Sequence, residues 1–257
     1  MTAGAVDALV SGASLKGKHA WVTGAGSGIG RASAVALARL GASVSLVGRT
    51  AESLHETARL IADHGGVATV RAGDVTDESF VATMMADERV DVLINSAGRN
   101  IPARLDEITP QAYESVMAVN VAAVLFVTQQ AVARMRYHGE GGSIVSIGSQ
   151  MGHVGGPNRI LYCSSKWALE GMTKALALEL AAEGIRVNTV APTFIHTELT
   201  ARSLADPEFR DWVLGEIPLG RLGSVDEVAA AVAYLASPAS SLTTGTSLLV
   251  DGGWTAH

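Results

Sequence analysis

A glycine-rich turn between a short apolar run and an alanine-rich segment constrains the fold of this chain most strongly. The turn is Thr23-Gly-Ala-Gly-Ser-Gly-Ile-Gly30, and it lies between residues 20–22 and residues 31–40, where apolar side chains recur at helical spacing. Strand, glycine turn and helix in this order open a dinucleotide-binding βαβ unit. The glycines let the backbone approach a pyrophosphate closely, and the N-terminus of the helix favours its negative charge.

The alternation of strand-like and helix-like segments continues along the chain. Helices are predicted between the strands, for example at 52–62 and 165–182, and apolar residues from Leu169 to Leu180 form a helical stripe. Alternating elements predict an α/β fold: one domain with a doubly wound, parallel, seven-stranded sheet of the Rossmann type. We expect a flexible extension at 1–14 and the domain at 15–257. The predicted strands are 19–22, 43–47, 68–71, 90–95, 143–147, 186–190 and 247–250.

The composition suits this architecture and argues against several partners. The 257 residues are 48% hydrophobic but only 5% aromatic, so the apolar content is mainly aliphatic, as in parallel strands covered by helices. The net charge of -6 argues against nucleic acid, because phosphate binding needs a basic face. We find no secretory signal and no apolar run that approaches the length of a membrane span. The expectation is a soluble, cytoplasmic protein that binds neither nucleic acid nor membrane.

A tyrosine and a lysine four residues apart carry the clearest chemical signal. Tyr162 and Lys166 would share one face of a helix, where the ammonium group would lower the pKa of the phenol toward working pH. A tyrosine tuned in this way can exchange a proton with an alcohol or a carbonyl. Ser149 precedes them and would stabilise charge on a substrate oxygen. The carboxyl ends of the parallel strands would bring these residues and the glycine turn into one crevice.

Together these motifs resemble those of the short-chain dehydrogenase/reductases, an NAD(P)-dependent family with Thr-Gly-x-x-x-Gly-x-Gly and Tyr-x-x-x-Lys motifs. The resemblance covers about residues 15–254 and includes the 3-oxoacyl-carrier-protein reductase-like and gluconate 5-dehydrogenase-like members. Two positions depart from the family pattern: Ser96, where asparagine is usual, and Thr193, where glycine is usual. The further matching segments are Asn95-Ser-Ala-Gly98, Val119-Asn-Val121, Arg186-Val-Asn188, Pro192-Thr-Phe-Ile-His-Thr197 and Gly245-Thr-Ser-Leu-Leu-Val-Asp-Gly-Gly253.

The resemblance implies roles for individual residues. Tyr162 would be the acid or base, Ser149 would bond the substrate oxygen, and Lys166 would also bind the nicotinamide ribose. Asn120 would complete the catalytic set by holding a water that links Lys166 to solvent. The implied cofactor contacts are Gly24, Ser27, Gly28, Ile29, Gly30, Arg49, Asp74, Val75, Asn95, Ala97, Gly98, Tyr162, Lys166, Pro192, Thr193, Ile195 and Thr197.

The end of the second strand distinguishes NADP from NAD. Gly48 stands where an acidic residue would bind the ribose 2′-hydroxyl of NAD, and Arg49 follows with a guanidinium suited to the 2′-phosphate of NADP. Arg49 can alternatively stack on the adenine or face water. The pattern favours NADP(H) and keeps NAD(H) as the alternative.

Polar residues near the catalytic segment indicate the class of substrate. Gln150, His153, Asn158 and Arg159 are the candidate substrate contacts. They favour a sugar, sugar acid or polyol as the secondary alcohol or ketone, and His153 has no companion ligands at a metal-binding spacing, so no metal is expected.

Three other functions use a similar fold and similar motifs. A 3-oxoacyl-[acyl-carrier-protein] reductase is the main alternative. A nucleotide-sugar epimerase or dehydratase is disfavoured because those proteins carry an added substrate domain, for which we expect no room in this chain. A non-catalytic nucleotide-sensing protein is disfavoured because Ser149, Tyr162 and Lys166 are all present.

Two further segments predict a lid and an assembly. Residues 193–222 lack clear periodicity and are expected to be a loop that covers the substrate. Residues 168–179 are rich in alanine, and residues 245–254 are apolar for a chain end. These features predict a homo-oligomer, and a tetramer in particular.

Overall fold

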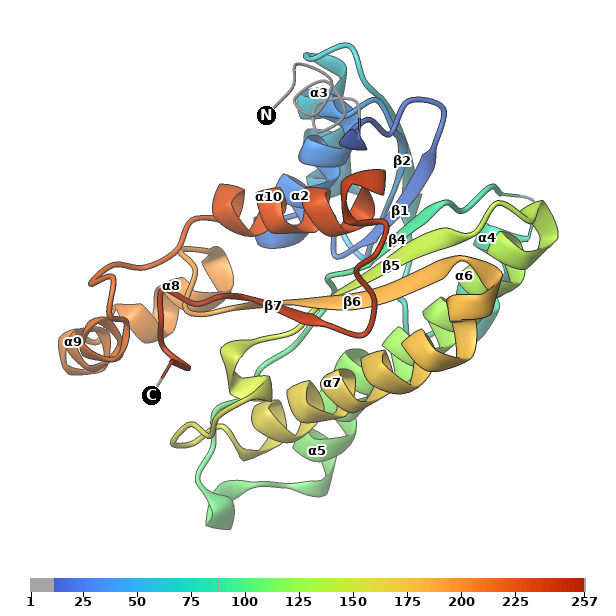
Figure 1. The fold of residues 1–257 in the computed structure, drawn as a ribbon. Coiled ribbons are helices and arrows are strands. Elements are labelled where there is room, and N and C mark those ends of the chain that lie inside the picture. The colour runs from blue at the N-terminus through green and yellow to red at the C-terminus, as the bar shows by residue number, and fades with distance from the viewer. Residues whose placement is uncertain (1–11, 87, 257) are drawn as a thin grey trace.

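Seven parallel strands form one sheet in the computed structural model, which describes residues 12–86 and 88–256 (Figure 1). Their order is β3-β2-β1-β4-β5-β6-β7. The order reverses between β1 and β4, which is where open α/β sheets bind ligands. The predicted doubly wound sheet is confirmed, whereas most of the predicted 1–14 extension, residues 1–11, lies outside the described residues. The strands are β1 (His19–Thr23), β2 (Ser43–Gly48), β3 (Val67–Ala72), β4 (Val92–Asn95), β5 (Gly142–Ile147), β6 (Ile185–Pro192) and β7 (Ser247–Val250).

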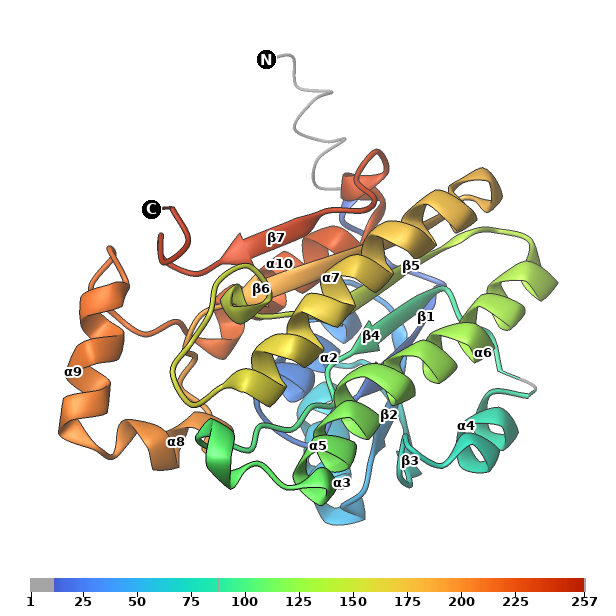
Figure 2. The same cartoon turned by 90° about the horizontal axis from the view of Figure 1, so that it is seen from below.

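Helices cover both faces of the sheet (Figures 1 and 2). One face carries α2 (Gly28–Arg39), α3 (Ala51–Ala62) and α10 (Val225–Ala236). The other carries α4 (Glu78–Met85), α5 (Pro110–Met117), α6 (Ala123–His138) and α7 (Ile160–Leu180). Alternate strand residues face opposite sides, so Val22 packs in the first core and Trp21 in the second. The short helical turns are η1 (Leu105–Glu107), η2 (Ala118–Ala122), η3 (Gln150–Gly152), η4 (Ala181–Glu183) and η5 (Pro238–Ser240).

The segment predicted to be a loop at 193–222 instead contains α8 (Glu198–Leu204) and α9 (Pro207–Glu216), so that expectation is wrong. Asp206 caps α9 by accepting a hydrogen bond from the Glu208 backbone N–H at 3.1 Å, and Pro207 occupies the first turn. Phe209 and Trp212 then pack with Trp254 near the end of the chain. Figure 2 shows α8 and α9 beyond the carboxyl edge of the sheet.

The helical stretch Pro110–His138 corrects a second expectation, because it is long and apolar enough to cross a membrane by length and composition. Less than half of its apolar window is buried within the chain. The buried part, which includes Val127 and Ala131, packs against the sheet, as in a core helix of a soluble protein.

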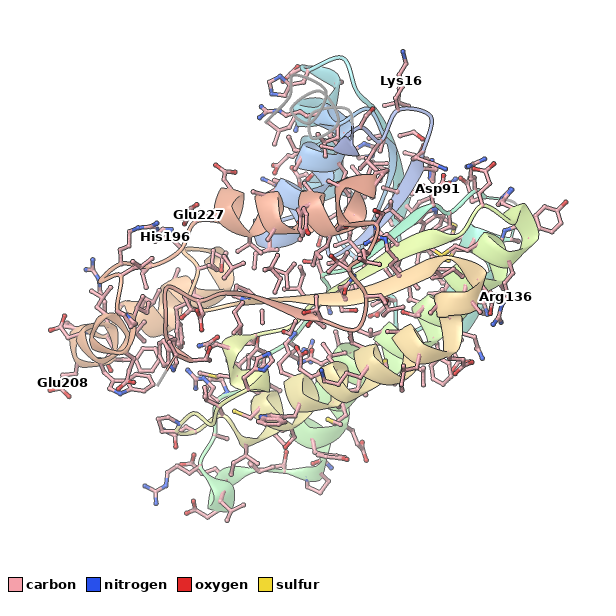
Figure 3. The ribbon with its side chains drawn as sticks, viewed as in Figure 1. Lys16, Asp91, Arg136, His196, Glu208 and Glu227 are labelled. Atoms are coloured by element: carbon pink, nitrogen blue, oxygen red, sulfur yellow. The ribbon has the colours of Figure 1, made fainter. Side chains whose placement is uncertain are left out.

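The two edges of the sheet differ in character. At the amino edge, Asp91 accepts hydrogen bonds from the His19 backbone N–H at 2.8 Å, from Arg89 at 2.7 Å and from Lys18 at 3.2 Å. Figure 3 shows Asp91 far from Glu208 of α9. These ion pairs and hydrogen bonds join the starts of β1 and β4. The polar residues of the predicted site lie at the opposite, carboxyl edge of the sheet.

Candidate active site

A cavity of about 490 Å³ lies at the carboxyl edge of the sheet, a size typical of small-molecule and cofactor sites. It contains all the predicted cofactor residues except Asn95, together with the predicted catalytic residues Ser149, Tyr162 and Lys166. A shallower depression between α3 and β3 contains none of the predicted site residues. The sequence motifs therefore meet in one place, as the strand order requires.

The glycine turn shapes the phosphate end of this cavity. Gly24 has φ 67°, and a Cβ there would lie 2.9 Å from the Ala97 backbone nitrogen. A Cβ on Gly30 would overlap the Gly24 carbonyl oxygen. No side chain that the structure describes caps α2 at Ser27, and its first turn contains no acidic residue. The N–H groups at the start of α2 are thus available to an anion.

Ser149, Tyr162 and Lys166 form the chemical centre of the cavity. The Ser149 hydroxyl donates to Gln150 Oε1 at 2.8 Å and accepts from the Met151 backbone N–H at 3.1 Å. Lys166 is 5% exposed, and its Nζ donates to the Ile147 carbonyl at 2.7 Å. The same Nζ lies 5.4 Å from the centroid of the Tyr162 ring. A hydroxyl, a phenol and an ammonium group thus converge beside the glycine turn.

Burial dominates the ionisation of these groups. It raises the pKa of Tyr162, and the neighbouring Ser149 hydroxyl opposes that shift. Burial also lowers the pKa of Lys166 to about 8, with the charge of Glu170 opposing it. The prediction that Lys166 would lower the pKa of Tyr162 is therefore wrong for the protein without a bound cofactor. The loss of hydration on burial raises the pKa of the phenol by more than the neighbouring polar and charged groups lower it.

Asn120 supports the site from a π-helical turn within the α5–α6 stretch. Its Oδ1 accepts from the Arg99 backbone N–H at 2.8 Å, and its Nδ2 donates to the Arg99 carbonyl at 2.8 Å and to Ser165 Oγ at 3.0 Å. The Ser165 hydroxyl donates to the Tyr162 carbonyl at 2.8 Å. Asn120 thus joins the 98–99 loop to the first turns of α7, and π turns of this kind are frequent at functional sites. Its role in holding a water stays a prediction.

Two arginines flank the end of the cavity beyond β2. Arg49 follows Gly48, and Arg99, which sequence reasoning missed, reaches the cavity from the loop after β4. Hydrogen bonding from the Thr76 backbone lowers the pKa of Asp74, and the charges of Arg49 and Arg99 lower it further. This end of the cavity therefore contains two guanidinium groups and one carboxylate, that of Asp74, and carries a net positive charge.

Several predicted residues lie outside the cavity lining. Asn95 donates from Nδ2 to Thr128 Oγ1 at 3.1 Å, so it ties β4 to α6 instead of facing a cofactor. His153 Nε2 lies 2.9 Å from Ser247 Oγ and 3.6 Å from Glu170 Oε1, behind the catalytic loop. Like Asn120, the predicted substrate contacts Gln150, His153, Asn158 and Arg159 also lie outside the lining.

Some residues that line the cavity were not among the predicted site residues. Most of them lie within a motif or directly adjoin one at the end of a strand, which is the signal that could have found them. They are Gly26, Gly48, Thr50, Ser53, Leu54, Gly73, Ser96, Arg99, Val119, Ile147, Gly148 and Thr200.

Metal ligation has no support among the residues that the structure describes, since no group of three or more His, Cys, Asp or Glu side chains is placed to hold an ion. His196, which lies in one of the segments that match the family, is exposed to solvent. Figure 3 shows it at the same end of the molecule as Glu208 of α9.

Comparison with known proteins identifies the relatives of this chain. A family model described as enoyl-(acyl carrier protein) reductase matches residues 24–255. Gluconate 5-dehydrogenase of Gluconobacter oxydans is 41% identical over 247 residues, 94% of this chain and 96% of the relative. D-threitol dehydrogenase of Mycolicibacterium smegmatis is 39% identical, with 94% of each chain covered. The crystal structure of a gluconate 5-dehydrogenase from Burkholderia cenocepacia in complex with NADP and tartrate superimposes with a TM-score of 0.92 at 33% identity, covering 96% of this chain and 99% of that one.

Proposed function

The chain belongs to the short-chain dehydrogenase/reductase family, and from that premise we propose that it transfers a hydride between NADP(H) and a secondary alcohol or ketone on a sugar, sugar acid or polyol. Family membership makes it an NAD(P)-dependent oxidoreductase that acts on CH–OH groups. One observation carries the proposal: a single cavity brings the glycine turn and Arg49 together with Ser149, Tyr162 and Lys166. Relatives named for gluconate and threitol support the choice of a hydroxylated substrate.

Tyr162 is the proposed acid when a carbonyl is reduced and the base when an alcohol is oxidised. Burial raises its pKa, so the phenol holds its proton and is ready to donate it. Ser149 bonds the substrate oxygen and stabilises the charge that develops there. Lys166 would hold the nicotinamide ribose, and Asn120 fixes the turn of α7 that carries Tyr162. The bound cofactor would supply the hydride when a carbonyl is reduced and accept it when an alcohol is oxidised.

Arg49 and Arg99 support NADP(H) as the cofactor. Their charges lower the pKa of Asp74, which follows β3, and both arginines line the cavity. A guanidinium pairs well with a phosphate, whereas the acidic residue that would favour NAD(H) is replaced by Gly48.

The proposal extends to the setting in which the enzyme works. It is a cytoplasmic homotetramer that acts on small molecules without nucleic acid or membrane, and residues 193–222, with α8 and α9, form its substrate lid. Apolar side chains support the assembly: Trp167 and Leu178 are exposed on α7, and Tyr234 and Leu249 are exposed on α10 and β7. Two self-complementary patches generate dihedral symmetry. Light scattering after gel filtration should give the mass of four chains, and a monomer would contradict the assembly.

A panel of substrates tests the function. Sugar acids, polyols and a 3-oxoacyl thioester are each incubated with NADP(H) or NAD(H), and the absorbance of the reduced cofactor is followed. We expect turnover of a sugar acid or polyol, and faster turnover with NADP(H). Turnover of the thioester alone would support the carrier-protein reductase alternative, and no turnover of any hydroxyl or oxo compound would refute the proposal.

A further inference from the structure

Arg159 is a buried cation close to Tyr162. Among the arginines whose side chains the structure describes, it alone is in the buried set, with 7% of its surface exposed. Its only hydrogen bond within the described residues runs from Nη1 to the neighbouring Asn158 carbonyl at 3.3 Å, and no described carboxylate pairs with it. A buried charge without a counter-charge is costly, so such a side chain is typical of a site for an anion.

The surroundings of Arg159 place this charge beside the reacting groups. Arg159 immediately precedes α7, and Tyr162 follows three residues later, on the same face of the helix. The two groups interact electrostatically. The guanidinium also lies 5.6 Å from the centroid of the Phe209 ring, so α9 covers it from the other side. Arg159 therefore lies just beyond the lining of the cavity, between Tyr162, which lines it, and Phe209 of the proposed lid.

The start of α7 adds a second positive feature. No side chain that the structure describes caps this 21-residue helix, and its first turn contains no acidic residue. Its first N–H groups and the positive end of its dipole favour an anion beside the guanidinium. The apolar ring of Phe209 excludes water and strengthens a charge pair formed there.

We propose that Arg159 and the N-terminus of α7 bind a carboxylate at the far end of the substrate. The substrate is accordingly a hydroxy acid or oxo acid of the sugar-acid class, and a neutral polyol is the poorer ligand. This inference rests on the proposed oxidoreductase function and names the substrate class within it.

Matched substrates test the assignment: gluconate and glucitol differ in the carboxylate and are otherwise alike in length and hydroxylation. Arg159→Met keeps the apolar stem and removes the charge. It should lower kcat/KM for gluconate about 10- to 100-fold more than for glucitol, the loss expected for a hydrogen-bonded charge pair. Arg159→Lys should recover part of the loss, because lysine keeps the charge without the fork geometry. Arg59→Met, at an exposed position on α3, is the control and should match the wild type on both substrates.

The outcomes separate this inference from the proposed function. Equal losses on gluconate and glucitol, no preference of the wild type for gluconate, or a stronger preference for a sugar phosphate would overturn the carboxylate assignment and leave the oxidoreductase function standing. If neither substrate turns over, gluconate binding to the NADP⁺-loaded protein is measured by calorimetry. Weaker binding by Arg159→Met than by the wild type supports the assignment, and equal or absent binding overturns it. Calorimetric titration of each variant with NADPH shows that it is folded.

Discussion

Lys166 should make the stability of the protein rise with pH over a defined range. Its ammonium group is buried, and burial lowers its pKa from 10.5 to about 8. Between about pH 8 and 10.5 the unfolded chain therefore binds more protons at this residue than the folded chain. Stability rises with pH wherever the unfolded state binds more protons. The cost of burying the charge is fully present below pH 8 and is relieved as the pH rises.

The size of the effect follows from the shift. Each unit of pKa corresponds to about 1.4 kcal/mol, so lowering the pKa of Lys166 from 10.5 to about 8 corresponds to about 3 kcal/mol. Lys166→Met keeps an apolar stem and removes the titration. The wild type should gain about 3 kcal/mol relative to this variant between pH 7 and pH 10.5.

Urea unfolding without cofactor, followed by circular dichroism at fixed protein concentration, measures this difference at a series of pH values. Lys174→Met is the matched control, because Lys174 is exposed on the same helix and should leave the pH dependence of the wild type unchanged. Parallel curves of unfolding free energy against pH for the wild type and Lys166→Met would show that folding does not lower the pKa of Lys166.

Three further changes test separate parts of the account. Arg49→Ala should weaken NADP(H) binding about tenfold, since an exposed charge pair is screened by water, and should spare NAD(H); equal calorimetric losses for both cofactors would contradict this. Gly30→Ala should abolish binding of either cofactor, because its methyl group overlaps the Gly24 carbonyl, whereas Gly215→Ala meets open space and should bind normally. Glu170→Gln removes a charge that raises the pKa of Lys166, so the rise in stability with pH should begin at lower pH than in the wild type; an unchanged onset would show that Glu170 does not act on Lys166.

The fold and most of the cavity could be predicted because they depend on local signals. The glycine turn and the alternation of elements determine strand positions, and the carboxyl ends of parallel strands share one edge. Gly24, Arg49 and Tyr162 accordingly meet in one cavity. The helix α9 lies in a segment without clear periodicity, where its start signal, Asp206-Pro207-Glu208, is the local feature that marks a helix.

The remaining differences depend on three-dimensional packing. Asn95 belongs to a motif, but the direction of its amide depends on how α6 packs over β4. Arg99 reaches the cavity because β4 lies beside β1 in the sheet. The pKa of Tyr162 rises because of burial, which the spacing of Tyr162 and Lys166 does not reveal.

Tyr162→Phe separates the proton-transfer role of Tyr162 from cofactor binding. The measurement is the rate of NADPH formation or consumption on the best substrate of the panel, for wild type and variant, after calorimetry has shown that both bind NADPH. We expect unchanged NADPH binding and a rate lower by roughly 10²–10⁴-fold, the contribution of a positioned acid–base group. Comparable rates for the two proteins would contradict it.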